Sequence, residues 1–157
     1  MRVQGTLVRI FDTNSGELLQ ELRRGAKEAE IYSLAFDAAS QWLACSSDSG
    51  TVHVFKLKRG GAGAGGAASA AAEDDKKAAE NSKSAFSFVK GLLPKYFSSE
   101  WSFAQFRVPE GARTIVGFGT EPNSIVVVCS DGSFYKALFD PQNGGECVQE
   151  TYAKFID

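Results

Sequence analysis

The stretch SSDSGTVHVF at residues 46–55 indicates a β-strand that follows a tight turn, because it joins a turn of small polar residues to a strand-forming run. A similar stretch, SDGSFYKALF, occupies residues 130–139, and GTLVRIF at residues 5–11 resembles the second half of both. Each copy begins its strand with glycine and a hydroxyl residue and ends it in phenylalanine. Apolar runs of strand length, WLAC at 42–45 and IVVVC at 125–129, precede the two turns. The chain therefore contains an internal β-repeat.

The spacing of the repeat is typical of a β-propeller blade. Gly5 and Gly50 lie 45 residues apart, whereas Gly50 and Gly132 lie 82 residues apart. An insertion of about 40 residues explains the difference and leaves a period of roughly 40–45 residues, with four short strands in each unit. Residues 60–72, which are all Gly, Ala or Ser, lie within the insertion and have the composition of a flexible linker.

We therefore predict an all-β fold, a partial β-propeller of about two and a half blades with a long Gly/Ala-rich and amphipathic insertion. The expected parts are a half blade at 1–25, a complete blade at 26–57 plus 101–109, a flexible linker and amphipathic membrane loop at 58–100, and a last blade at 110–157. The expected strands are 6–12, 17–23, 31–36, 42–46, 51–57, 101–108, 114–118, 124–129, 133–139 and 146–155. Trp42 and Trp101 are expected in the core. Because repeats bury their cores against neighbours, we expect open blade faces that aggregate or pair with another chain.

Composition excludes several classes of protein. The 157 residues carry 17 basic and 19 acidic side chains, a balance that argues against a nucleic-acid binder. A single histidine excludes a multi-histidine metal site, and three cysteines without a C-x-x-C pair exclude a zinc ribbon. We expect no metal and no cofactor. No apolar run reaches the roughly 18 residues that a membrane-spanning helix needs, and the odd cysteine count fits a cytoplasmic protein.

Two adjacent arginines, Arg23 and Arg24, end the expected strand 17–23 and precede Gly25. Neighbouring residues on a strand point to opposite faces, so the pair could serve two separate anion sites. The guanidinium fork suits phosphate. The alternative is a pair of surface or salt-bridged arginines.

The lone histidine, His53, shares a strand face with Thr51, and Ser47 comes from the preceding turn. Two hydroxyls and an imidazole in one place would form a cradle for phosphate. The alternative is an exposed strand histidine. A catalytic triad of Ser47, His53 and Asp48 is formally conceivable, but the sequence lacks a nucleophile-elbow pattern, and we do not predict an enzyme.

A basic, aromatic stretch follows the linker. Its apolar residues, several of them at helical spacing, flank Lys90 and are typical of a membrane-interface anchor. The residues expected to insert are Phe86, Phe88, Val89, Leu92 and Leu93. The alternative is a loop that folds its phenylalanines onto the adjacent blade.

Four segments together resemble the PROPPIN family, and their sequences are similar to those of its plant-like members: LRRG at 22–25, IYS at 31–33, SSDSGTVHVF at 46–55 and LPKYFSSEWSFA at 93–104. The resemblance covers nearly the whole chain apart from residues 58–83. It implies a seven-bladed, WD-repeat-like propeller that binds phosphoinositides in autophagy and endolysosomal trafficking. Such a protein would be cytoplasmic and recruited peripherally to autophagosome precursors, endosomes or vacuoles.

The resemblance also implies two sites for phosphatidylinositol 3-phosphate and phosphatidylinositol 3,5-bisphosphate, one on each side of the arginine pair. The second site would use Arg24, Gly25, Ser47, Thr51 and His53. The first would use Arg23, Gly5, Thr6 and Arg9, although MRVQ at 1–4 stands where the family has small hydroxyl residues. Other autophagy proteins are candidate partners.

Two weak membrane signals together would anchor the protein: a headgroup held by the arginines, and apolar burial by the tethered loop. Protonation of His53 is expected to strengthen headgroup binding at lower pH. The rival interpretation is a protein-interaction propeller, in which the arginine pair engages acidic peptides and the loop is packed down.

Overall fold

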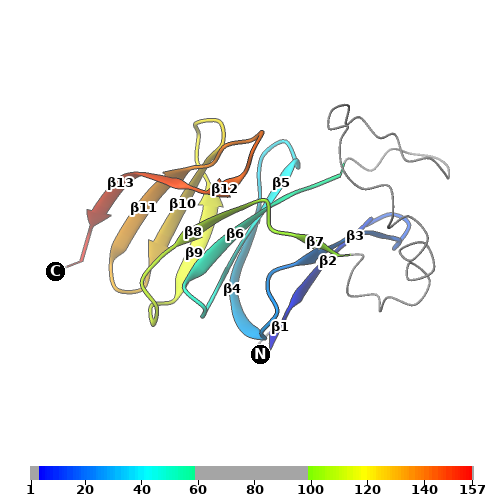
Figure 1. The fold of residues 1–157 in the computed structure, drawn as a ribbon, viewed down its shortest axis with the longest axis horizontal. Coiled ribbons are helices and arrows are strands. Elements are labelled where there is room, and N and C mark those ends of the chain that lie inside the picture. Colours follow the sequence, from blue (N-terminus) through cyan, green and yellow to red (C-terminus); the bar gives the residue numbers. More distant parts are fainter. Residues whose placement is uncertain (1–3, 59–98, 157) are drawn as a thin grey trace, which may run out of the picture. The chain divides into compact units, whose positions relative to one another are not determined.

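The computed structural model describes residues 4–58 and 99–156, and within these ranges every regular element is a β-strand. The strands form three sheets (Figure 1). Burial alternates with a period of two along strands such as Ala104–Arg107 and Ser133–Leu138, whereas Trp42–Ser47 is buried on both faces.

The central sheet has six strands in the order β1-β4-β5-β6-β8-β12. Their bounds are β1 Gln4–Gly5, β4 Ala29–Phe36, β5 Trp42–Ser47, β6 Thr51–Lys56, β8 Ala104–Arg107 and β12 Gly145–Glu146. The strands β4, β5, β6 and β8 pair antiparallel in turn, so that β8 follows β6 although residues 59–98 separate them in sequence.

The second sheet contains the C-terminal strands in the order β13-β11-β10-β9, all antiparallel. Its strands are β9 Thr114–Phe118, β10 Ser124–Cys129, β11 Ser133–Leu138 and β13 Val148–Lys154. The third sheet is an antiparallel hairpin, β2 Leu7–Phe11 and β3 Leu18–Arg23, to which β7 Glu100–Trp101 adds in parallel.

Short parallel bridges connect the sheets at their outer strands. β7 pairs with β3, and β12 pairs with β8. In the chain, β7 comes just before β8, and β12 comes just before β13. Each bridging strand therefore leads into the outer strand of the following sheet. The sequence repeat is therefore accompanied by a repeated two-residue clasp, which the sequence pattern alone did not indicate.

Two apolar clusters fill the space between the sheets. The larger joins the central and C-terminal sheets through residues such as Trp42, Phe106 and Phe139. The smaller joins the central sheet to the hairpin and contains Leu22, Leu43, Cys45 and Phe55. Both faces of β6 are thus buried: Val52 and Val54 face the larger cluster, and Phe55 faces the smaller.

Three expectations need correction. The strand predicted at 101–108 is two elements, because Trp101 belongs to β7 in the hairpin sheet and only 104–107 join β6. The strand predicted at 146–155 likewise begins within β12 before β13 starts. Trp42 is buried as expected, but Trp101 is 61% exposed and is not a core residue. Apolar patterning cannot separate a two-residue clasp from the strand that follows it.

The part of the chain that the structure describes has no helix long and apolar enough to span a bilayer. The residues predicted to insert into the membrane, at 86–93, lie outside the described ranges.

Candidate anion-binding site

The ends of β5 and β6 place polar side chains on the face that packs against the hairpin sheet. Cys45 and His53 are cross-strand partners, and Leu43, Cys45 and Phe55 on this face belong to the smaller cluster. By the same alternation Ser47 and Thr51 lie on this face, where the cluster ends. Ser47 and His53 are buried, and Thr51 is half-buried.

Arg24, which follows β3, points toward this end of the central sheet. Its backbone N–H donates to the Thr6 carbonyl at 2.9 Å, and its Nη1 donates to the Ser49 hydroxyl at 3.3 Å. Its Nη2 donates to the Lys27 carbonyl. The residue is only 5% exposed, and its buried Nε has no hydrogen-bond partner among the described residues. A buried guanidinium with an unused donor is suited to an anion, because an unmet buried donor costs free energy.

Further hydroxyl groups lie next to Ser49 and next to His53. Ser47 Oγ and Ser49 Oγ lie 2.9 Å apart, and His53 Nδ1 lies 3.1 Å from Ser102 Oγ. Ser102 also accepts a hydrogen bond from Gln105 Nε2 at 3.0 Å. The sequence analysis missed Ser49 and Ser102. Ser49 lies in the quoted turn, whereas Ser102 is brought to His53 only by the pairing of β6 with β8.

Burial is the larger cause, and the positive charge of Arg24 the smaller, that together lower the pKa of His53 from 6.5 to about 4. The imidazole is therefore neutral at physiological and mildly acidic pH, and Arg24 carries the positive charge next to it. Strengthening of binding by a protonated His53 is thus not expected in that range for the unliganded protein. The sequence could not reveal this, because the shift arises from burial.

Arg23 faces away from Arg24, as alternation along the strand predicts. Its Nε donates to Ser99 Oγ at 3.0 Å, and its guanidinium carbon lies 5.7 Å from the centroid of the Trp101 ring. Arg23 and Trp101 are also register partners in the β3–β7 bridge. Ser99 and Trp101 are therefore neighbours of this arginine that the sequence analysis did not assign.

The other residues of the expected first site are less closely gathered. Arg9 forms an ion pair with Glu21 at 2.9 Å, which neutralises its charge. Gly5 lies in β1 and pairs with Ala29, and Thr6 contacts Arg24 through its carbonyl. The structure thus brings Ser47, Thr51 and His53 to the end of the central sheet that Arg24 contacts. The binding roles of both sets of residues stay predictions.

Comparison with known proteins identifies the family. A family model described as PROPPIN matches residues 2–154. The chain belongs to the PROPPIN family.

Named relatives of this PROPPIN chain are autophagy-related proteins. It is 40% identical over 154 residues to "Autophagy-related protein 18e" of Arabidopsis thaliana, covering 98% of this chain and 37% of that protein. The chain spans between 37% and 46% of the length of the curated relatives it matches.

Solved structures establish the fold. KlAtg21, in its complex with the coiled coil of AgAtg16, superposes with a TM-score of 0.64 at 20% identity, covering 97% of this chain and 36% of that one. The β-propeller domain of Myceliophteria thermophila Cps50 (Swd1) gives a TM-score of 0.50 at 10% identity, covering 95% and 32%. The predicted fold class, a partial β-propeller, is confirmed.

The catalytic triad considered for this PROPPIN chain is not assembled. Ser47 contacts Ser49, His53 contacts Ser102, and Asp48 Oδ1 accepts the backbone N–H of Glu30 at 3.1 Å. Among the residues that the structure describes, no group of three His, Cys, Asp or Glu side chains could hold a metal ion.

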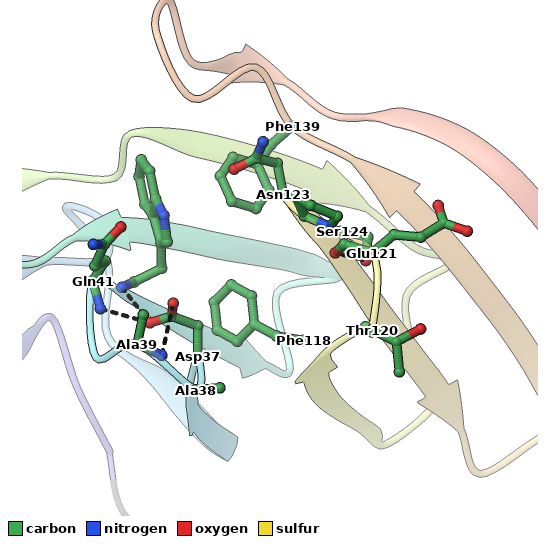
Figure 2. Close-up of a pocket in the computed structure, with 13 residues that line it drawn as sticks. Asp37, Ala38, Ala39, Gln41, Phe118, Thr120, Glu121, Asn123, Ser124 and Phe139 are labelled. Carbon is green, nitrogen blue, oxygen red and sulfur yellow. Dashed lines mark hydrogen bonds between the residues drawn. The ribbon is translucent and has the colours of Figure 1, made fainter.

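A separate cavity of about 280 Å³ lies between the β4–β5 and β9–β10 turns (Figure 2). Trp42, Phe118 and Phe139 contribute apolar surface to it. Asp37 accepts hydrogen bonds from the backbone N–H groups of Gln41 and Trp42 at 2.6 and 2.7 Å, so its carboxylate stabilises the β4–β5 turn. The cavity lies at the opposite end of β5 from Ser47 and does not belong to the arginine site.

Proposed function

We propose that this PROPPIN chain is a non-catalytic, phosphoinositide-binding peripheral membrane protein of autophagy. Its ligands would be phosphatidylinositol 3-phosphate and phosphatidylinositol 3,5-bisphosphate. It would be recruited from the cytoplasm to autophagosome precursors, endosomes or vacuoles.

The observation that carries this proposal is the buried, incompletely bonded guanidinium of Arg24 beside Ser47, Ser49 and the neutral His53. No ion pair involves Arg24 among the described residues. A phosphate group would supply the missing negative charge and accept charge-assisted hydrogen bonds, while the hydroxyls and the imidazole complete its shell.

Two weaker elements belong to the same proposal. Residues 86–93 would add apolar burial in the bilayer, which together with the headgroup gives stable anchoring. Autophagy proteins would be further partners, because the relative KlAtg21 is solved in a complex with the coiled coil of AgAtg16.

The test is flotation of the chain with vesicles that contain phosphatidylinositol 3-phosphate, phosphatidylinositol 3,5-bisphosphate or unphosphorylated phosphatidylinositol. Arg24→Gln should reduce binding to the 3-phosphorylated vesicles at least about tenfold, since it removes a charge-assisted hydrogen bond. The matched control removes a positive charge remote from the site: Lys154→Gln on the exposed strand β13, which should bind as the unmodified chain does.

Equal flotation of Arg24→Gln and Lys154→Gln would contradict the lipid proposal. Binding of an acidic peptide that depends on Arg24, without binding to vesicles, would instead favour a protein-interaction propeller.

A further inference from the structure

The side chain of Gln20 joins the residues on both sides of the segment 59–98 to the strand that carries the arginine pair. We call these flanking residues, 56–58 and 99–101, the neck. Gln20 Nε2 donates to the Lys56 carbonyl and to Glu100 Oε2, each at 3.0 Å. Its Oε1 accepts the backbone N–H of Lys58 at 3.0 Å. The amide thus uses both of its N–H groups and its oxygen on the neck.

These hydrogen bonds extend the contact beyond the ladder of β6 and β8. That ladder runs from Thr51–Arg107 to Val54–Ala104, so it does not reach Lys58 or Glu100. Lys58 Nζ and Glu100 also form an ion pair across the neck. Both partners are partly exposed, so this pair alone contributes little.

The exit side of the neck is held a second time by the same strand. Leu22 and Arg23 pair with Glu100 and Trp101 in the parallel bridge. Arg23 in addition donates to Ser99. β3 therefore contacts the neck through Gln20 on one face and Arg23 on the other.

Because Gln20 is buried, its amide needs the hydrogen bonds that it forms with the neck. Gln20 is 7% exposed and, by alternation, lies on the same strand face as Leu22, which belongs to the smaller apolar cluster. An apolar side chain would fill such a position without the cost of burying an amide. The amide of Gln20 instead lies where each of its polar groups forms a hydrogen bond with the neck.

We infer that Gln20 is a positioning residue that clamps the two sides of the neck to the strand that carries the arginine pair, and that membrane binding through residues 86–93 and headgroup binding depend on this clamp to act together. This inference rests on the proposed function, because it concerns how that segment and the headgroup site act together. Loss of the clamp should weaken binding to vesicles while sparing binding to the soluble headgroup.

The experiment compares Gln20→Leu and Gln20→Glu in the full 157-residue chain. Gln20→Leu keeps the volume and removes the hydrogen bonds. Gln20→Glu keeps the shape and places a carboxylate against that of Glu100. Three quantities are measured: hydrogen exchange of the Lys58 amide, binding to vesicles with phosphatidylinositol 3-phosphate, and calorimetric binding of soluble inositol 1,3-bisphosphate.

In both variants the Lys58 amide should exchange faster, vesicle affinity should fall about tenfold, and headgroup affinity should change by less than about twofold. Combining Gln20→Glu with Glu100→Gln exchanges donor and acceptor and should recover part of the vesicle binding. The matched control, Gln149→Leu on exposed β13, should change none of these quantities.

Unchanged vesicle affinity in a variant whose Lys58 amide exchanges faster would overturn the clamp. Equal loss of headgroup and vesicle affinity would also overturn it, because Gln20 would then support the headgroup site itself. If the unmodified chain binds no 3-phosphorylated vesicles, the proposed function fails first and the inference falls with it.

Discussion

Arg24 and His53 influence each other across the candidate site. The pKa of His53 is lowered first by burial and second by the charge of Arg24. An anion bound at Arg24 would oppose the second effect and leave the first. The pKa of the imidazole should therefore rise when an anion binds at Arg24.

Removal of the Arg24 charge should raise the pKa of His53. We expect the imidazole of Arg24→Gln to titrate above about 4 but still below the unperturbed 6.5, because burial is the larger cause. An NMR titration of the His53 ring protons measures this directly. An unchanged pKa in the variant would show that the two side chains are not electrostatically coupled.

The same pKa shift makes stability depend on pH. The unfolded chain binds a proton at His53 near pH 6.5, whereas the folded chain binds it only near pH 4. Stability should therefore be constant above pH 6.5 and fall as pH decreases from 6.5 toward 4, by at most about 3 kcal/mol. Urea unfolding at several pH values measures this. His53→Gln should lose that part of the pH dependence, and an identical pH profile for both proteins would contradict the prediction.

At the scale of elements, the two parallel clasps hold neighbouring sheets together at their outer strands. β12 depends on Gly144, which has a φ of 68° and whose missing Cβ would lie 2.2 Å from the Phe103 carbonyl oxygen. The next backbone N–H, of Gly145, donates to the same carbonyl at 2.9 Å. The close approach and the positive φ both require glycine here.

Gly144→Ala should displace the clasp and destabilise the fold by about 1–3 kcal/mol. The adjacent Gly145→Ala has a similar backbone strain, with a φ of 90°, but its added Cβ meets no atom within 4 Å. The difference in unfolding free energy between these two variants isolates the contact with Phe103. Equal destabilisation would mean that backbone strain alone matters.

Local patterning predicts the long strands well but not the clasps. The run at 42–45 and the strand expected at 51–57 correspond to β5 and β6, whose apolar residues are buried because both faces of these strands pack against neighbouring sheets. Two-residue strands such as β7 carry no pattern of their own. For that reason Trp101 was assigned to the wrong sheet.

At the scale of the whole molecule, the C-terminal sheet exposes apolar side chains on the face opposite the larger cluster. Ile115, Val128 and Phe134 form one cross-strand row, and Ile115 is 67% exposed. Val148 on the edge strand β13 is 69% exposed. A chain with this surface is prone to association.

We expect this chain to sediment with a concentration-dependent mass and Ile115→Lys to weaken the association. The charge would have to be buried in any sheet-to-sheet contact, which is costly. Analytical ultracentrifugation over a range of concentrations measures the effect. A monomer at every concentration would contradict the prediction.

The strand faces can be predicted from the order of the residues: the repeat indicates propeller blades, and alternation places Ser47, Thr51 and His53 on one face and Arg23 and Arg24 on opposite faces. The packing of the sheets determines which distant residues meet. Ser102 joins His53 from 49 residues away, and Glu100 joins Gln20 from 80. It also decided that His53 is neutral. Strand faces follow from the local period of the backbone, whereas contacts between strands and the burial of an ionisable group arise only when the sheets pack.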